Sequence, residues 1–168
     1  MASFGTNSTK NINTLHIDLR KILSKAIQIY DFSVIEGLRE DARQFKLFEE
    51  KKTKLDGIKK RSKHQKVICS LYESGISENG RYLSDDDGTP ICSKAADIVP
   101  YKKGEDPFES SELNLRRFYF MQGVIFAVAE QLLKDGEITH KVRFGIDWDS
   151  DMVYRDQSFH DLPHLELI

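Results

Sequence analysis

The sequence has little of what marks a membrane, secreted or nucleic-acid-binding protein. No apolar run approaches the roughly 20 residues that a membrane-spanning helix needs. The first residues, Met-Ala-Ser-Phe-Gly-Thr-Asn-Ser, lack the basic and apolar regions of a secretory signal. The formal net charge is only −2, and charges of both signs are spread along the chain, so there is no electrostatic case for binding nucleic acid. We therefore expect a protein that is made in the cytoplasm, has no membrane span and binds no nucleic acid.

Cysteine is also scarce, because the 168 residues include only Cys69 and Cys92. A chain of this length is the size of one domain, and it can bury a sizeable core without relying on disulfide bonds. We therefore expect a single domain over residues 1–168.

Apolar periodicity predicts a mixture of helices and strands. Helices are expected over residues 15–27, 40–50 and 113–134, and strands over residues 32–36, 95–99, 142–145 and 164–167. The buried side of the last helix is predicted to carry Phe118, Met121, Val124, Ile125, Val128 and Leu132. Gly136 suits the end of that helix, and Pro100 stops the second strand. This order of elements predicts an α+β domain.

The clearest chemical signal lies near the end of the chain, where Asp161 precedes His164 by three residues. One short segment thus offers a carboxylate base and an imidazole that can bind a metal. A catalytic zinc needs three protein ligands, usually histidine or carboxylate, and an open fourth position for water. Such a pair is common by chance, so it gains weight only if other segments supply the missing ligands. His160 and His164 are also spaced like a helical metal pair, but Pro163 argues against a helix there.

Upstream segments offer residues of the required types. Ser62 and His64 lie in a stretch rich in lysine and arginine, where a histidine is more often a solvated loop residue. Asp97 lies in an apolar run, where an unpaired buried carboxylate would be costly, so a functional interpretation is harder to dismiss. Arg39 follows the first predicted strand, and its alternative is an ordinary surface ion pair.

Taken together, these segments resemble the motifs of a family of zinc peptidases. The family includes the bacterial D-Ala-D-Ala carboxypeptidases and the phage L-alanyl-D-glutamate endolysins. Its pattern is roughly G-[IL]-R, then S-x-H-x-x-G-x-A-x-D, then D-x-P-H-x-E. The matching segments here are Gly37-Leu38-Arg39, the His64 and Asp97 blocks, and Asp161-Leu-Pro-His164-Leu-Glu166. The resemblance runs from about Asn13 to Leu167 and implies the D,D-peptidase/hedgehog-like fold, a small antiparallel sheet flanked by helices.

The resemblance also implies a role for each residue of these motifs. Three residues would bind zinc, namely His64, Asp97 and His164. Asp161 would deprotonate a water molecule and later protonate the leaving amine. Arg39 would hold a carboxylate or a developing oxyanion with its guanidinium fork. Ser62 would orient backbone or substrate near the metal, and Glu166 would accept a hydrogen bond from a ligand histidine.

The spacing of the ligands departs from the family in one place. In the family the metal histidine precedes the metal aspartate by seven residues, but seven residues before Asp97 stands Pro90, which cannot bind zinc. Either the first ligand is lost and the site is degenerate, or residues 67–92 are a loop inserted between two ligands. Residues 62–66 joined directly to residues 93–97 give an almost intact motif, which favours the insertion.

The inserted segment and a later loop suggest further features. Cys69 and Cys92 lie near the two ends of the insertion, so a disulfide at its base is conceivable in an oxidising compartment, and two free thiols are the alternative. The acidic residues 85–87 could bind calcium, although a solvated turn is favoured. A second acidic set resembles a hard-cation loop but lacks the length and terminal glutamate of an EF-hand, so a polar loop is favoured there too. This second set consists of Asp147, Asp149 and Asp151.

The resemblance therefore implies a zinc-dependent peptidoglycan endopeptidase of the phage endolysin type, which cuts the L-Ala–D-Glu bond of the stem peptide. The alternatives are a D-Ala-D-Ala carboxypeptidase, which uses the same metal chemistry, and a catalytically silent or regulated family member acting as a binding module. The expected cofactor is Zn²⁺, with Ca²⁺ as a candidate regulator. The expected protein is a monomer made in the host cytoplasm, which reaches the cell wall with the help of a phage holin.

Overall fold

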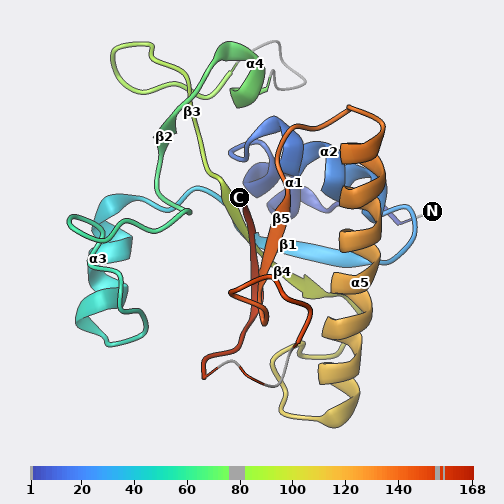
Figure 1. The fold of residues 1–168 in the computed structure, drawn as a ribbon. Helices are drawn as coiled ribbons and strands as arrows, with labels where there is room; N and C mark the ends of the chain where they lie inside the picture. Colours follow the sequence, from blue (N-terminus) through green and yellow to red (C-terminus); the bar gives the residue numbers. More distant parts are fainter. Residues whose placement is uncertain (1, 76–81, 154–155, 157) are drawn as a thin grey trace.

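The computed structural model describes residues 2–75, 82–153, 156 and 158–168 (Figure 1). Its helices are α1 (Thr6–Ile12), α2 (Ile17–Ala26), α3 (Asp41–Glu49), α4 (Leu71–Ser74) and α5 (Glu112–Lys134). Its strands are β1 (Phe32–Glu36), β2 (Val67–Ile68), β3 (Ile91–Cys92), β4 (Ala95–Pro100), β5 (Val142–Gly145) and β6 (Asp161–Leu167). All the helices and strands predicted from the sequence are present, with ends that differ by a few residues.

Four of the strands form one antiparallel sheet in the order β1-β4-β6-β5, and β2 pairs with β3 in a separate two-stranded ribbon. β4 and β6 are the central strands, and their register places Asp97 opposite His164 and Ala95 opposite Glu166. The long helix α5 runs alongside the sheet and contacts α2, β4 and β5 (Figure 1). The predicted fold, a small antiparallel sheet flanked by helices, is confirmed.

The hydrophobic core lies where the sheet meets α2 and α5, because the apolar faces predicted from the sequence meet there. The predicted apolar positions of the first long helix are all buried: Leu15, Leu19, Ile22, Leu23, Ala26 and Ile27. On α5 the predicted positions Phe118, Met121, Ile125 and Leu132 are buried, while Val124 and Val128 are partly buried against the same cluster. Gly136 follows the helix end with a φ of +72°, a left-handed conformation that glycine adopts without strain.

The helix α1 was not predicted, because its sequence contains a single apolar residue, Ile12. Its polar side chains instead cover the outer edge of β1. The Val34 N–H donates to Ser8 Oγ over 3.0 Å, and the Asn11 side-chain amide donates to the Val34 carbonyl over 2.9 Å. These bonds occupy backbone groups that an edge strand would otherwise leave open.

The last strand begins at Asp161, three residues before the predicted start. Pro163 lies outside the stretch that pairs with β4, which covers residues 164–166 only. A proline is tolerated at this position because no backbone N–H is required there to donate a hydrogen bond to β4. Among the described residues, no helix combines the length and apolar character needed to cross a membrane.

The segment predicted as an insertion projects from the sheet as the β2–β3 ribbon together with α4 (Figure 1). Its residues 76–81 lie outside the described part of the chain. The α4 helix docks on α2, where the buried Arg20 donates to the Ser74 carbonyl over 2.6 Å. His16 Nε2 lies 3.5 Å from a carboxylate oxygen of Glu73 in the same contact. That this segment is an insertion into a single domain stays a prediction.

Both cysteines are free thiols in the structure. In the β2–β3 ribbon Cys92 is paired with Val67, and the Cys69 N–H donates to the Pro90 carbonyl over 3.0 Å. The two cysteines are therefore diagonal neighbours rather than directly opposed ones, an arrangement with a longer separation than directly facing residues have. Burial raises the pKa of both thiols. The structure contains the reduced pair, and a disulfide under oxidising conditions stays a prediction.

Candidate metal centre

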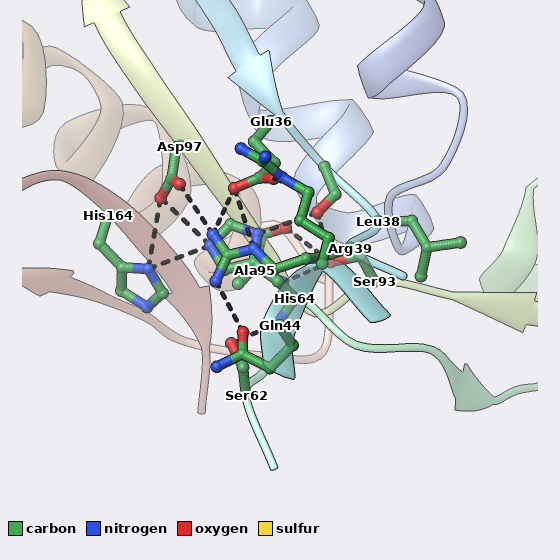
Figure 2. Close-up of polar contacts among 12 residues, drawn as sticks. Glu36, Leu38, Arg39, Gln44, Ser62, His64, Ser93, Ala95, Asp97 and His164 are labelled. Carbon is green, nitrogen blue, oxygen red and sulfur yellow. Dashed lines mark hydrogen bonds and ion pairs between the residues drawn. The ribbon is translucent and has the colours of Figure 1, made fainter. Parts of the chain in front are cut away.

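Three side chains from distant parts of the sequence converge beside the sheet (Figure 2). His64 Nε2 lies 3.1 Å from Asp97 Oδ1 and 3.3 Å from His164 Nδ1. His164 Nδ1 in turn lies 3.5 Å from the same oxygen of Asp97. The β4–β6 register supplies Asp97 and His164 as facing residues, and the loop before β2 delivers His64. The three residues expected to bind a metal are thus brought together, and both histidines are buried.

The distances between these three atoms match the distances between neighbouring ligands in a tetrahedral zinc site. Zinc binds nitrogen and carboxylate oxygen at about 2.0–2.2 Å, so tetrahedral ligands lie about 3.3–3.5 Å from one another. The observed separations of 3.1, 3.3 and 3.5 Å match that spacing. Two imidazoles and one carboxylate are also the donor types that catalytic zinc sites use. The residues present therefore fit a metal of this kind.

The second nitrogen of each histidine has a hydrogen-bond acceptor of its own. His64 Nδ1 lies 2.9 Å from the Gly37 carbonyl, and His164 Nε2 lies 3.1 Å from Glu166 Oε2. When each of these nitrogens donates its proton to the acceptor, the other nitrogen keeps a lone pair that faces the centre. Glu166 was expected in this position from the sequence. It is held in turn by Arg143, whose Nε donates to Glu166 Oε1 over 3.0 Å.

Arg39 contacts three protein groups at the site, and the expectation that it binds substrate stays a prediction. Its guanidinium donates to Glu36 over 3.0 Å, to Gln44 over 2.9 Å and to Asp97 Oδ2 over 3.3 Å (Figure 2). The fork is therefore committed to protein groups, and it orients the carboxylate whose other oxygen faces the histidines. Burial by itself would raise the pKa of Asp97, but hydrogen bonds from His164 and His64 outweigh burial and hold that pKa well below its usual range.

Asp161 lies at the start of β6 with its side chain partly exposed. Burial raises its pKa above the ordinary value for aspartate, and the neighbouring His164 only partly offsets this. Within the described residues no hydrogen bond engages its carboxylate. Gly145 allows the close approach of the strands here, because a Cβ on Gly145 would lie 2.7 Å from the Cβ of Asp161. A free carboxylate with a raised pKa suits proton transfer.

Ser62 is buried and faces the backbone rather than open space. Its Oγ accepts a hydrogen bond from the His64 N–H over 3.2 Å, and its own N–H donates to Gln65 Oε1 over 2.9 Å. Ser62 thus holds the loop that carries His64. Of the two roles suggested by the sequence, orienting backbone or orienting substrate, these contacts correspond to the first.

Four supporting residues were missed by sequence reasoning: Glu36, Gln44, Arg143 and Trp148. The Trp148 ring packs 5.2 Å from the His164 ring, and the Arg143 guanidinium lies over the same indole at 5.6 Å. Gln44 is fully buried and also donates to the Leu55 carbonyl over 2.7 Å. No motif signals these residues, because their role depends on packing between segments far apart in the sequence.

Other groups of possible metal ligands are explained by local structure. Asp18 Oδ2 accepts hydrogen bonds from Thr139 and His140, so the cluster of His16, Asp18 and His140 joins α2 to the chain before β5. In the run 85–87, Asp85 is paired with Lys66 at 2.6 Å, and Asp87 accepts the Thr89 N–H over 2.9 Å. This is the solvated turn favoured from the sequence.

The acidic loop after β5 brings its carboxylates together. Ligand atoms of Asp147, Asp149 and Asp151 all lie within 4.8 Å of one another. The buried Asp147 accepts hydrogen bonds from the backbone N–H groups of Asp151 over 3.2 Å and of Met152 over 3.1 Å. Its carboxylate therefore helps to hold the loop in this conformation.

The chain matches known peptidases along its whole length. The sequence model of the family described as phage L-alanyl-D-glutamate peptidase matches residues 1–168. A curated relative, the L-alanyl-D-glutamate peptidase of Escherichia phage T5, is 25% identical over 172 residues, which cover 98% of this chain and 97% of that protein. The crystal structure of an L-Ala D-Glu endopeptidase of Serratia marcescens is similar in fold, with a TM-score of 0.56 and 20% identity over 99% of this chain and 90% of that chain.

Proposed function

This chain belongs to the phage L-alanyl-D-glutamate peptidase family, whose members are hydrolases of the bacterial cell wall, and from that membership we propose that it is a zinc endopeptidase cutting the L-Ala–D-Glu bond of the peptidoglycan stem peptide. The observation that carries the choice of metal is the convergence of His64, Asp97 and His164 at the spacing of tetrahedral ligands. A carboxypeptidase is not favoured, because neither the family description nor the phage T5 relative names one.

The roles of the surrounding residues follow from their positions. Zinc held by two neutral imidazoles and one carboxylate would supply Lewis acidity, which lowers the pKa of a coordinated water to about 7. Asp161, with its raised pKa, takes a proton from the attacking water and returns it to the leaving amine. Arg39 keeps Asp97 in place from the other side. Gly37 and Glu166 fix the imidazole orientations of the two histidines.

The metal assignment is tested by elemental analysis of purified wild type beside His64→Ala and His160→Ala. We expect about one zinc per chain in the wild type and in His160→Ala, and none in His64→Ala. His160 is the matched control because it is exposed and lies outside the converging triangle. Wild-type protein that binds no zinc even after loading would refute the zinc site and favour the silent binding module.

The reaction is tested on purified cell walls by mass spectrometry of the released peptides. An endopeptidase of this kind exposes a new N-terminal D-Glu, whereas a carboxypeptidase releases free D-Ala. Release of D-Ala without new D-Glu termini would favour the carboxypeptidase. Digestion that is lost in His64→Ala and in Asp161→Asn would support the assigned roles.

The proposal also covers where the protein acts, its oligomeric state and its regulation. As in an endolysin, the protein is made in the host cytoplasm and reaches the wall when a holin opens the membrane. It acts as a monomer.

Calcium is a candidate regulator at Asp147, Asp149 and Asp151, supported by the closeness of their oxygens. Calorimetric titration with Ca²⁺ tests it, and the absence of binding heat in the millimolar range would remove calcium from the proposal.

A further inference from the structure

The loop between α3 and β2 concentrates positive charge. Residues 51–66, here called the basic loop, contain seven lysines, one arginine and a single acidic residue, Asp56, in a chain whose formal net charge is −2. The rest of the chain is therefore acidic. All eight basic residues of the loop are exposed, namely Lys51, Lys52, Lys54, Lys59, Lys60, Arg61, Lys63 and Lys66.

Most of these positive charges are not neutralised within the molecule. Three of the basic residues, Lys52, Arg61 and Lys66, are paired with carboxylates at 2.8, 3.6 and 2.6 Å. The other five have no ion pair within the ranges that the structure describes: Lys51, Lys54, Lys59, Lys60 and Lys63. The basic loop thus presents a net positive surface that an anionic partner can approach.

A tight turn in this loop presents two of the unpaired lysines beside an apolar residue. Asp56 Oδ1 accepts the N–H groups of Ile58, Lys59 and Lys60 over 2.9, 2.8 and 2.9 Å. The exposed fraction of Ile58 is 76%, and both lysines are exposed as well. An exposed apolar side chain next to cations is typical of protein segments that bind the interface of an anionic lipid layer.

Two buried glutamines hold the basic loop in a fixed shape. Gln44 donates to the Leu55 carbonyl over 2.7 Å, and Gln65 donates to the Gly57 carbonyl over 3.0 Å. Both glutamine side chains are fully buried. Because the loop is already ordered, it loses little conformational freedom when it binds a partner.

The position of the basic loop favours a lipid layer as this partner. α3 and the loop after it stand apart from the sheet (Figure 1), and Gln44 is the one residue of α3 that is buried. A flat anionic surface can therefore meet the basic loop before it meets the acidic remainder of the chain. A nucleic acid would also attract the lysines, but its phosphate backbone offers nothing to Ile58, whereas the headgroup region of a lipid layer can accept an apolar side chain.

We propose that the basic loop binds the surface of membranes that contain anionic lipids, with Lys59 and Lys60 contacting the headgroups and Ile58 entering the layer. Each lysine near such a surface strengthens binding about fivefold. Burial of Ile58 strengthens it about tenfold. The inference goes beyond the proposed peptidase function and does not depend on it, since neither the metal nor the cell-wall substrate takes part in this binding.

The test is cosedimentation with vesicles of phosphatidylcholine, either alone or mixed with an equal part of phosphatidylglycerol. We expect the wild type to bind only the mixed vesicles and to be released when NaCl is raised from about 0.1 M to about 1 M. Lys59→Gln/Lys60→Gln should weaken binding about 25-fold, and Ile58→Ser about tenfold. The matched control is Lys103→Gln/Lys134→Gln, which removes two exposed lysines outside the basic loop and should bind like the wild type.

Three results would overturn the inference. The first is a wild type that does not bind the mixed vesicles, and the second is equal weakening in the two double variants, which would assign binding to the overall charge. The third is a wild type that binds duplex DNA in the same buffer but no vesicles, which would assign the basic loop to nucleic acid. None of them bears on the endopeptidase function, which the new D-Glu termini in purified walls test separately.

Discussion

At the scale of single residues, the two carboxylate oxygens of Asp97 contact different groups. One of its oxygens faces His64 and His164, and the other faces the guanidinium of Arg39. A lysine at position 39 would keep the charge but could not contact Glu36 and Asp97 with one rigid planar fork. We predict that Arg39→Lys lowers zinc affinity about 10–100-fold, the usual effect of losing a group that orients a ligand. Competition with a chromogenic chelator measures this affinity.

The matched control is Arg43→Lys. Arg43 also contacts Glu36, over 2.6 Å, but its side chain is 62% exposed and does not touch Asp97. This variant should bind zinc like the wild type. Equal zinc affinity in Arg39→Lys and Arg43→Lys would show that the contact between Arg39 and Asp97 does not support the metal.

The single tryptophan of the chain lies against a proposed ligand. The rings of Trp148 and His164 are 5.2 Å apart, and Trp148 also stacks on Phe159 at 6.4 Å. We predict that adding zinc to the metal-free protein changes the intrinsic fluorescence of Trp148 at a stoichiometry of about one, because the charge on the neighbouring imidazole changes. The change should vanish in His164→Ala and persist in Phe159→Leu. A zinc response that survives in His164→Ala would place the bound metal elsewhere.

The sequence indicated the proposed ligands and one group that holds them, Glu166, but not the other supporting contacts. His64, Asp97 and His164 were recognised because a family motif records residue types at fixed spacings, once residues 67–92 were interpreted as an insertion between its parts. The contact of Arg39 with Asp97, in contrast, arises from the relative placement of β1 and β4. Trp148 likewise packs on His164 only because the loop after β5 turns back over the sheet. Spacing along one chain carries no record of such packing.

At the scale of elements, buried Asp18 joins α2 to the segment before β5. Its Oδ2 accepts the N–H groups of Thr139 and His140 over 3.0 and 3.1 Å. Burial would raise the pKa of Asp18, but these hydrogen bonds outweigh it and lower the pKa below the ordinary value of 3.8. A depressed folded-state pKa stabilises the fold above the unfolded-state value, and this stability is lost as the pH falls through the folded-state value.

We therefore predict that Asp18→Asn lowers the free energy of unfolding by about 1–3 kcal/mol at pH 7. The difference between wild type and variant should shrink as the pH falls below about 4, because protonated Asp18 loses its advantage. Urea denaturation at several pH values measures both effects. A difference that stays constant down to pH 2 would show that the charge of Asp18 is not responsible.

The elements themselves were predictable to different degrees. The helix α5 and the strand β4 have strong apolar patterns, so their positions followed from periodicity. The helix α1 has no such pattern, since it is stabilised by bonds of Ser8 and Asn11 to the edge of β1. The start of β6 at Asp161, three residues before the predicted one, was also missed. Both errors concern contacts with a partner strand that the local sequence does not specify.

At the scale of the whole molecule, the segment between β2 and β3 is attached at two adjacent points. Ile68 and Ile91 are antiparallel partners, so the chain leaves the ribbon and returns to it at one place. A two-residue Asn-Gly turn can join such a pair directly. We predict that replacing residues 69–90 with Asn-Gly leaves a folded protein that still binds about one zinc, because none of the three converging residues lies in the deleted segment.

The same deletion should reduce stability, because α4 is docked on α2 by a buried contact. Removing Ser74 leaves the guanidinium of Arg20 without one of its three carbonyl partners, which costs about 1–3 kcal/mol. Zinc content and urea denaturation of the shortened protein therefore separate two roles of the segment. Cooperative unfolding with lower stability and full zinc content is the expected result, since the segment is then an addition to a complete metal centre. Cooperative unfolding without zinc would mean that the β2–β3 segment holds His64 in place, and the ligand triangle would then depend on the insertion rather than merely accommodate it.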